Sequence, residues 1–279
     1  MFILCRRKGE VVALELRLGS LGEFRDFLAS HPTAMDPAHI QSVAERIRTR
    51  GTVQTRRLGT LPVVVIGDNY REGVLAMGIP GRAFAMLDMV DAHTKEDPDA
   101  RLLCLEGVTP FARTLCAAYP RAVCSEYAPD EESQRRIAPV PHVDVMSMQF
   151  GDRSFDAIVS GDVFEHVPDL PRALRECARV LDPGGILIAT FPFAAGSETT
   201  IQKAVLEEGR IRHLTEPEYH GDPMRPGEGV LVFQIPGWDI LDQCCSAGFS
   251  KAEMVYVADE SRGIMATHLE GVLVLRATR

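Results

Sequence analysis

The sequence lacks the motifs of several common protein classes. Its seven cysteines include no CxxC pair, and no Cys or His spacing is typical of a zinc site or a disulfide framework. We therefore expect reduced, mostly buried thiols and no metal site. No apolar run approaches the ~20 residues of a membrane-spanning helix. The start, with Arg6, Arg7 and Lys8 after apolar residues, reverses the charge order of a secretory signal. These features predict a cytoplasmic protein with no membrane partner.

Positive charge is also scarce, since the formal net charge is −9. This balance argues against nucleic acid as a partner, because such binding depends on clustered Lys and Arg. The charge is unevenly distributed: residues 1–60 hold ten basic and six acidic residues, whereas residues 61–279 hold twenty and thirty-three. The excess of basic over acidic residues in residues 1–60 has two interpretations. It indicates either a small module whose charges are solvated or an RNA-binding arm, and the first is favoured.

The N-terminal residues have signals of a small α+β module. Strand-like stretches at 2–5 and 11–18 predict a hairpin, and capped helices are predicted to begin after Ser20 and Asp36. We assign residues 1–70 to this module. Assembly of a homo-oligomer through it is a further hypothesis.

Residues 71–279 alternate strand-length apolar runs with helix-period segments. This alternation predicts an α/β fold, a doubly wound, mostly parallel seven-stranded sheet. The connection 259–268 is too short for a parallel crossover, so the last two strands are expected to form an antiparallel edge hairpin. An insertion rich in Pro and Gly is expected at 213–236. The expected strands are 101–105, 121–125, 155–160, 185–191, 252–258 and 269–276, and the expected helices are 82–93, 110–119, 169–181, 197–209 and 237–247.

The loop after the first expected strand has no GxGxxG motif, which disfavours a nicotinamide cofactor because such glycines let the backbone approach a pyrophosphate. Glu126, which ends the second strand, follows Glu106 by twenty positions. A carboxylate at that spacing can accept both hydroxyl protons of an adenosine ribose. The alternative is a solvated strand-end glutamate. Thr109 and Pro110 have the residue types of a helix cap and a first helical residue.

Several motifs in the middle of the chain resemble class I S-adenosylmethionine-dependent methyltransferases. They are Asp144-Val145, Asp162 to Asp169, Asp182-Pro183-Gly184-Gly185 and Phe191-Pro192-Phe193. The stretches 105–111 and 216–223 are similar to a bacterial subgroup with a glycine-poor first motif. The resemblance implies S-adenosylmethionine as cofactor and methyl transfer as reaction. The cofactor-binding residues that we infer are Glu106, Gly107, Thr109, Glu126, Asp144, Val145, Ser160 and Asp162.

Two histidines are candidates for the catalytic role. His220 in the insertion, or His166 after the fourth strand, would remove a proton from an oxygen or nitrogen of a small-molecule acceptor, since imidazole titrates near neutral pH. The alternatives are a structural His166 that anchors the next helix and an insertion that is only a surface loop. Metal binding by the histidines and carboxylates of the insertion is a less favoured alternative, because His213 and His220 are seven residues apart and form no i, i+4 pair. A noncatalytic S-adenosylmethionine-binding regulatory or partner protein is the competing function.

Overall fold

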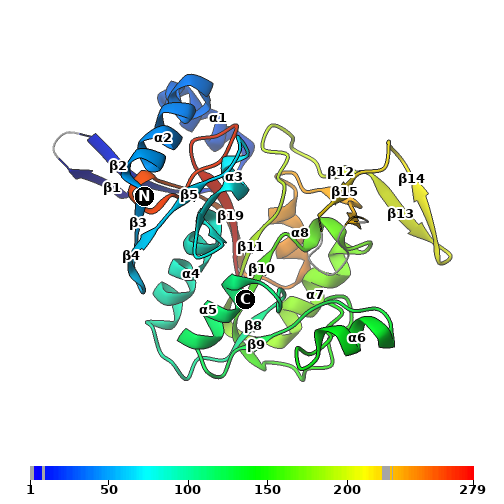
Figure 1. Cartoon of the computed structure of the whole chain (residues 1–279). Helices are drawn as coiled ribbons and strands as arrows, with labels where there is room; N and C mark the ends of the chain where they lie inside the picture. Colours follow the sequence, from blue (N-terminus) through cyan, green and yellow to red (C-terminus); the bar gives the residue numbers. More distant parts are fainter. Residues whose placement is uncertain (1–2, 8–9, 222–226, 228) are drawn as a thin grey trace. The chain divides into compact units, whose positions relative to one another are not determined.

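The computed structural model describes the chain except for residues 1–2, 8–9, 222–226 and 228 (Figure 1). The chain divides into two compact units: Met1–His93 with Glu253–Leu275, and Thr94–Ala252 with Arg276–Arg279. The domain boundary expected at residues 70 and 71 stays a prediction. None of the helices in the described ranges is long and apolar enough to cross a membrane.

Both ends of the chain contribute strands to the first unit. β1 (Ile3–Arg7) pairs antiparallel with β2 (Glu10–Leu18), as the sequence predicts, and β2 pairs antiparallel with β18 (Lys251–Asp259). β19 (Val272–Thr278) follows β18 in the strand order. The N-terminal hairpin therefore extends a sheet that includes C-terminal strands. The remaining elements of this unit are α1 (Leu21–Ser30), η1 (Pro32–Met35), α2 (Pro37–Arg50), β3 (Thr52–Thr55), β4 (Gly59–Pro62), β5 (Val64–Val65), α3 (Tyr70–Gly73), β6 (Val74–Ala76), β7 (Ile79–Pro80), α4 (Gly81–Thr94) and η3 (Glu260–Arg262).

The caps predicted for the first two helices are present. Ser20 Oγ accepts from the N–H of Glu23 at 3.2 Å, and the Glu23 carboxylate accepts from Gly19 at 2.6 Å. Asp36 accepts from the N–H of Ala38 at 3.0 Å at the start of α2. These bonds satisfy N–H groups that the helices themselves leave unpaired.

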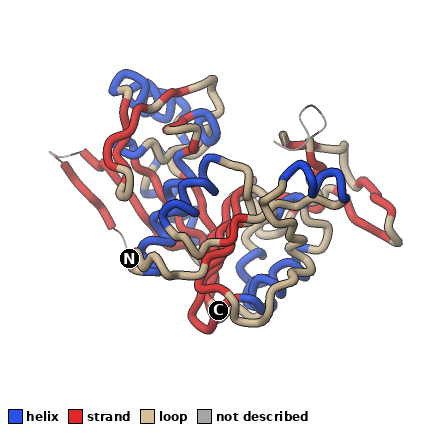
Figure 2. Tube along the Cα trace, turned by 60° about the horizontal axis from the view of Figure 1, so that its bottom comes forward, coloured by secondary structure: helices blue, strands red, loops and turns tan. Residues whose placement is uncertain are grey.

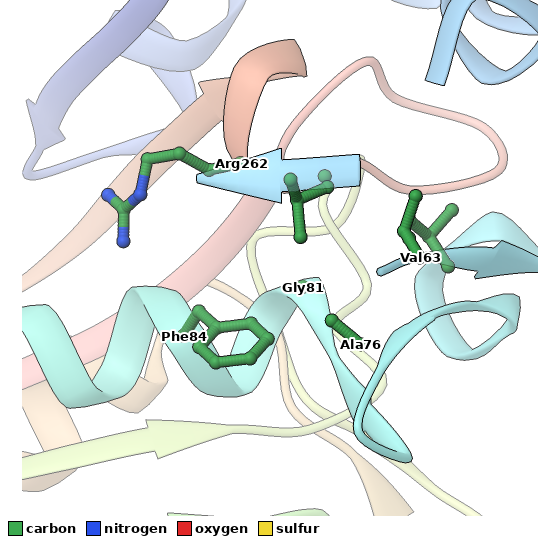
Figure 3. Close-up of a pocket in the computed structure, with 8 residues that line it drawn as sticks. Val63, Ala76, Gly81, Phe84 and Arg262 are labelled. Carbon is green, nitrogen blue, oxygen red and sulfur yellow. The ribbon is translucent and has the colours of Figure 1, made fainter. Parts of the chain in front are cut away.

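Apolar side chains from several elements surround a small hollow in the first unit (Figure 3). Figure 3 shows the guanidinium of Arg262 at the end of this group opposite Val63. The hollow leaves no room for a water molecule. It is therefore part of the packing of the first unit. Its lining residues are Val53, Val63, Val74, Ala76, Gly81, Phe84, Arg262 and Gly263.

The second unit contains a parallel sheet in the order β11-β10-β8-β9. The strands are β8 (Leu102–Cys104), β9 (Val123–Cys124), β10 (Phe155–Gly161) and β11 (Leu181–Thr190). Four successive residues of β10, from Ala157 to Ser160, are buried, as expected for a strand covered on both faces. The predicted α/β fold class is confirmed, but the last two strands, β18 and β19, do not form an edge hairpin, because β2 pairs along the outer side of β18 and β1 follows β2. The helices of the unit are α5 (Pro110–Ala118), α6 (Glu131–Ile137), η2 (Phe164–His166), α7 (Leu170–Val180) and α8 (Ile240–Ala247).

Short strands occupy the segment where a helix was predicted over 197–209, so that prediction is wrong. β13 (Ala204–Glu207) and β14 (Arg210–His213) form an antiparallel hairpin, which projects from the second unit in Figures 1 and 2. Its two turn residues, Glu208 and Gly209, both have positive φ, the geometry of a type I′ turn. The other strands of this region are β12 (Ile201–Gln202), β15 (Tyr219–His220), β16 (Val230–Leu231) and β17 (Gln234–Ile235).

The cysteines differ in one respect from the prediction. Cys116 of α5 and Cys124 of β9 form a disulfide, so the expectation of reduced thiols is wrong for this pair. The reason is the packing of α5 beside β9, which brings the two sulfurs together. Cys104, Cys177 and Cys244 are free and buried, as expected.

Candidate functional site

Three strands of the second unit end at the same edge of the sheet. Cys104 of β8 lies level with Val159 of β10 and with Cys124 of β9. Since parallel strands bring their carboxyl ends to one edge, the loops that follow lie together there. Ligands bind at this position in open α/β sheets.

The twenty-residue spacing between Glu106 and Glu126 corresponds to a direct contact between the two loops. Glu126 Oε2 accepts from the N–H of Gly107 at 3.2 Å, and its Oε1 accepts from the N–H of Tyr127 at 3.3 Å. These two bonds hold the Glu126 carboxylate against the first loop. Glu126 is partly exposed at this edge.

Gly107 is the residue of the first loop that allows this contact. A Cβ at this position would lie 2.4 Å from Val140 Cγ1 and 3.0 Å from the carbonyl oxygen of Ser125. The loop therefore needs glycine for close packing against the end of β9. Thr109 has a different role, because its Oγ1 accepts from the N–H of Ala112 at 3.1 Å and caps α5.

The other predicted donor-site residues lie in the loops after β9 and at the end of β10. Asp144 accepts from the N–H of Met146 at 2.8 Å, and Val145 is buried. The Ser160 hydroxyl is buried and has no hydrogen-bond partner among the described residues. Asp162 has a φ of 53° and donates its N–H to Thr190 of β11 at 2.8 Å. A positive φ is uncommon for aspartate and occurs often at functional sites.

The two predicted catalytic histidines lie together around Glu165. Glu165 Oε1 lies 3.6 Å from His166 Nε2 and 3.7 Å from His220 Nδ1, and the imidazole centroids are 5.3 Å apart. The Glu165 side chain is fully buried, whereas those of His166 and His220 are 16% and 30% exposed. His166 and His220, which the sequence analysis gives as alternatives, therefore lie in one site. We call Glu165, His166 and His220 the Glu165 cluster.

Each histidine is held by a second contact on its outer nitrogen. His166 Nδ1 lies 2.9 Å from the carbonyl oxygen of Leu231, and His220 Nε2 lies 3.0 Å from Glu218 Oε1. Lys203 lies 2.6 Å from the other oxygen of Glu218. The Glu165 carboxylate, and then Glu218, raise the pKa of His220, while Lys203, and then His220, lower the pKa of Glu218.

Backbone contacts from the following segment hold the turn that carries Glu165. The N–H of Phe233 donates to the Glu165 carbonyl oxygen at 2.8 Å. Buried Gln234 donates through Nε2 to the carbonyl oxygens of Phe164 and Val167, at 2.6 and 2.8 Å. Residues of the insertion therefore contact His166 and the turn that carries Glu165.

The sequence analysis did not assign Glu165, Glu218 or Lys203 to a site. In the sequence, the only signal for Glu165 is its position next to His166. Its burial depends on contacts with residues near 233, almost seventy positions later.

Part of the second unit is similar to a known protein family. Residues 111–189 match the model of a methyltransferase domain family. This segment is similar to a methyltransferase domain. The matched residues run from α5 through β11 and exclude the loop 105–109, so the glycine-poor first motif stays a prediction. The predicted family is confirmed for this domain.

Curated relatives carry methyltransferase names. A demethylmenaquinone methyltransferase of Staphylococcus haemolyticus is 45% identical over 136 residues, which cover 46% of this chain and 53% of that protein. An uncharacterized methyltransferase of Mycobacterium sp. (strain KMS) is 29% identical over 182 residues, which cover 60% and 69%. The chain spans between 30% and 53% of the length of the first three curated relatives.

Solved structures with a similar chain course include an amino pentose methyltransferase from Micromonospora echinaspora with S-adenosylmethionine bound. It is 20% identical, with a TM-score of 0.44, and the match covers 71% of this chain and 93% of that one.

Proposed function

We propose that this chain is an S-adenosylmethionine-dependent methyltransferase that acts on an oxygen or nitrogen of a small-molecule acceptor. One observation carries the proposal: the methyltransferase family matches residues 111–189, which include the loops after β9 and β10. Residence in the cytoplasm, the absence of nucleic-acid partners and a homo-oligomer remain predictions from the sequence.

The loops at the sheet edge supply the proposed donor site. Glu126 would accept the ribose hydroxyls of the donor, and Asp144 would accept from the adenine amine, with the N–H of Val145 facing a ring nitrogen. The donor contains no phosphate, so a first loop with Gly107 alone suits it better than a dinucleotide. The remaining residues proposed for the methionine part and the loop contacts are Glu106, Thr109, Ser160 and Asp162.

The proposed reaction is an in-line displacement. A lone pair on the acceptor would form a bond to the methyl carbon that S-adenosylmethionine supplies, the sulfur would leave with the electron pair, and the acceptor would lose its proton to a base. Holding the two reactants at near-attack distance supplies most of the acceleration. His166 and His220 are proposed to position the reacting atom of the acceptor. Their role as proton acceptor stays a prediction.

Calorimetry with S-adenosylmethionine, S-adenosylhomocysteine and NAD tests the donor assignment. Saturable binding of the first two and none of NAD is expected, because the first loop lacks the glycines of a pyrophosphate site. Saturable NAD binding without a response to S-adenosylmethionine would overturn the assignment.

Glu126→Gln is expected to weaken S-adenosylhomocysteine binding by about 10- to 100-fold, since a hydrogen bond to a charged group contributes about 1.5–3 kcal/mol. Glutamine keeps the shape but offers one acceptor oxygen instead of two. Glu132→Gln, at an exposed position in α6, is the matched control and should bind as the parent chain does. Equal affinities in both variants would remove Glu126 from the donor site.

Turnover is measured as S-adenosylhomocysteine released with fractionated bacterial metabolite pools. His166→Ala and His220→Ala are each expected to reduce it by ~100-fold or more, because both side chains meet at Glu165. His213→Ala, at an exposed site in β14, serves as control. Full turnover in either cluster variant would exclude that histidine from the reaction. Donor binding without release from any pool would support the noncatalytic alternative.

A further inference from the structure

The hydrogen bonds of the Glu165 cluster determine which ring nitrogens carry protons. A carbonyl oxygen only accepts, so His166 Nδ1 is the donor to Leu231 and Nε2 holds the lone pair in the neutral ring. The Glu218 carboxylate likewise makes His220 Nε2 the donor, which leaves the lone pair on Nδ1. In neutral rings, both lone pairs therefore lie on the nitrogens that face Glu165.

Three electron-pair donors consequently converge on one point. The nitrogens lie 3.6 and 3.7 Å from Glu165 Oε1, and all three atoms lie within 4.8 Å of one another. Neither oxygen of the fully buried Glu165 carboxylate has a hydrogen-bond partner within the part of the chain that the structure describes. A buried carboxylate without hydrogen bonds is costly unless a cation compensates it.

We propose that Glu165, His166 and His220 form a binding site for one divalent transition-metal ion. Glu165 Oε1, His166 Nε2 and His220 Nδ1 are its ligands. Two imidazoles and one carboxylate suit Zn²⁺, Fe²⁺ or Co²⁺, whereas Mg²⁺ and Ca²⁺ prefer oxygen ligands. This assignment differs from the sequence analysis, which predicts no metal site.

The observed spacing is close to that of a metal centre. Tetrahedral ligands with metal bonds of about 2.1 Å lie about 3.4 Å apart, a few tenths of an ångström less than the two distances to Glu165. His220, with 30% of its side chain exposed, has the most room to close this difference. Three protein ligands leave coordination positions open, as in catalytic rather than structural sites.

The surroundings of the ligands match those of known metal centres. Histidine ligands usually donate their second N–H to a backbone carbonyl or a carboxylate, and here His166 donates to Leu231 and His220 to Glu218. Lys203 fixes Glu218 in turn. Phe233 and Gln234 hold the backbone around Glu165, so the ligands are positioned before an ion arrives.

Titration of the full chain, freed of metal with a chelator, tests the site without donor or acceptor. We expect one equivalent of Zn²⁺ by calorimetry, one equivalent of Co²⁺ by visible absorption, and a higher melting temperature with Zn²⁺. Glu165→Gln, His166→Gln and His220→Gln should each weaken Zn²⁺ binding by ~100-fold or more. His213→Gln is the matched control and should bind as the parent chain does.

The metal-free melting temperature of Glu165→Gln separates a metal site from a structural ion pair. If Glu165 serves a cation site, the neutral variant should melt at or above the temperature of the parent chain, because a buried charge is removed. A lower melting temperature together with no Zn²⁺ binding by the parent chain would overturn the proposal. So would Zn²⁺ binding that persists in all three ligand variants. Because neither measurement uses S-adenosylmethionine, either result is independent of the proposed methyl transfer.

Discussion

A chain that begins at residue 61 is expected to be insoluble or to lose its cooperative melting transition. The deletion removes β2, whose residues Leu14, Leu16 and Leu18 are buried opposite β18. Burial of each leucine contributes about 1.5–3 kcal/mol, while a whole domain is stable by only about 5–15 kcal/mol. The exposed edge of β18 would also be free to pair with other chains.

The deletion also removes the partner of a buried aromatic residue. Tyr256 of β18 is fully buried, and its ring centroid lies 4.7 Å from that of Phe27 in α1. A chain that begins at Glu10 is the control, since it lacks β1 but keeps β2 and α1. That control should melt cooperatively. If the chain from residue 61 melts as sharply as the control, residues 1–60 form an independent module after all.

Elements defined by neighbouring residues could be predicted from the sequence. Ser20 and Asp36 cap helices because their side chains reach N–H groups only two or three residues away. The buried run of β10 is strand-like because both faces of a parallel sheet are covered. In each case the determining interaction lies within the segment itself or follows from its hydrophobicity.

The errors have long-range or conformational causes. A helix was predicted over residues 197–209, but the positive φ of Glu208 and Gly209 turns the chain into a hairpin over residues 204–213. Glutamate is uncommon in that turn, so the usual Asn-Gly or Asp-Gly signal is missing. The pairing of β2 with β18 joins residues more than 230 positions apart, which local periodicity cannot indicate.

The candidate site also contains one part that could be predicted from the sequence and one that could not. Glu126 could be proposed from its spacing because an acidic residue that contacts a ribose typically lies about 20 residues after the first loop of such a fold. The Glu165 cluster could not be proposed as a unit, since it forms only when β16 carries Leu231 to His166 and β15 carries His220 to Glu165. The sequence therefore predicted both histidines as alternatives instead of partners.

Gly107→Ala is expected to weaken S-adenosylhomocysteine binding by ~100-fold or more and to lower the melting temperature by several degrees. The new Cβ would lie 2.4 Å from Val140 Cγ1 and 3.0 Å from the Ser125 carbonyl oxygen, so the loop must move. Overpacking of this kind costs about 1–3 kcal/mol. The movement also breaks the bond from the Gly107 N–H to Glu126, which is worth about 1.5–3 kcal/mol when the acceptor is charged.

A second substitution tests whether packing is the cause. In Gly107→Ala combined with Val140→Ala, the contact at 2.4 Å is removed and only the one with Ser125 remains, so about half of the lost binding free energy should return. Gly151→Ala is the matched control, because its Cβ would meet only Ser154 Oγ, at an ordinary contact distance of 3.7 Å. The control should bind S-adenosylhomocysteine as the parent chain does. Parent-like affinity in Gly107→Ala would instead show that the first loop lies outside the donor site. If Val140→Ala restores none of the lost affinity, the contact with Ser125 is the cause of the loss.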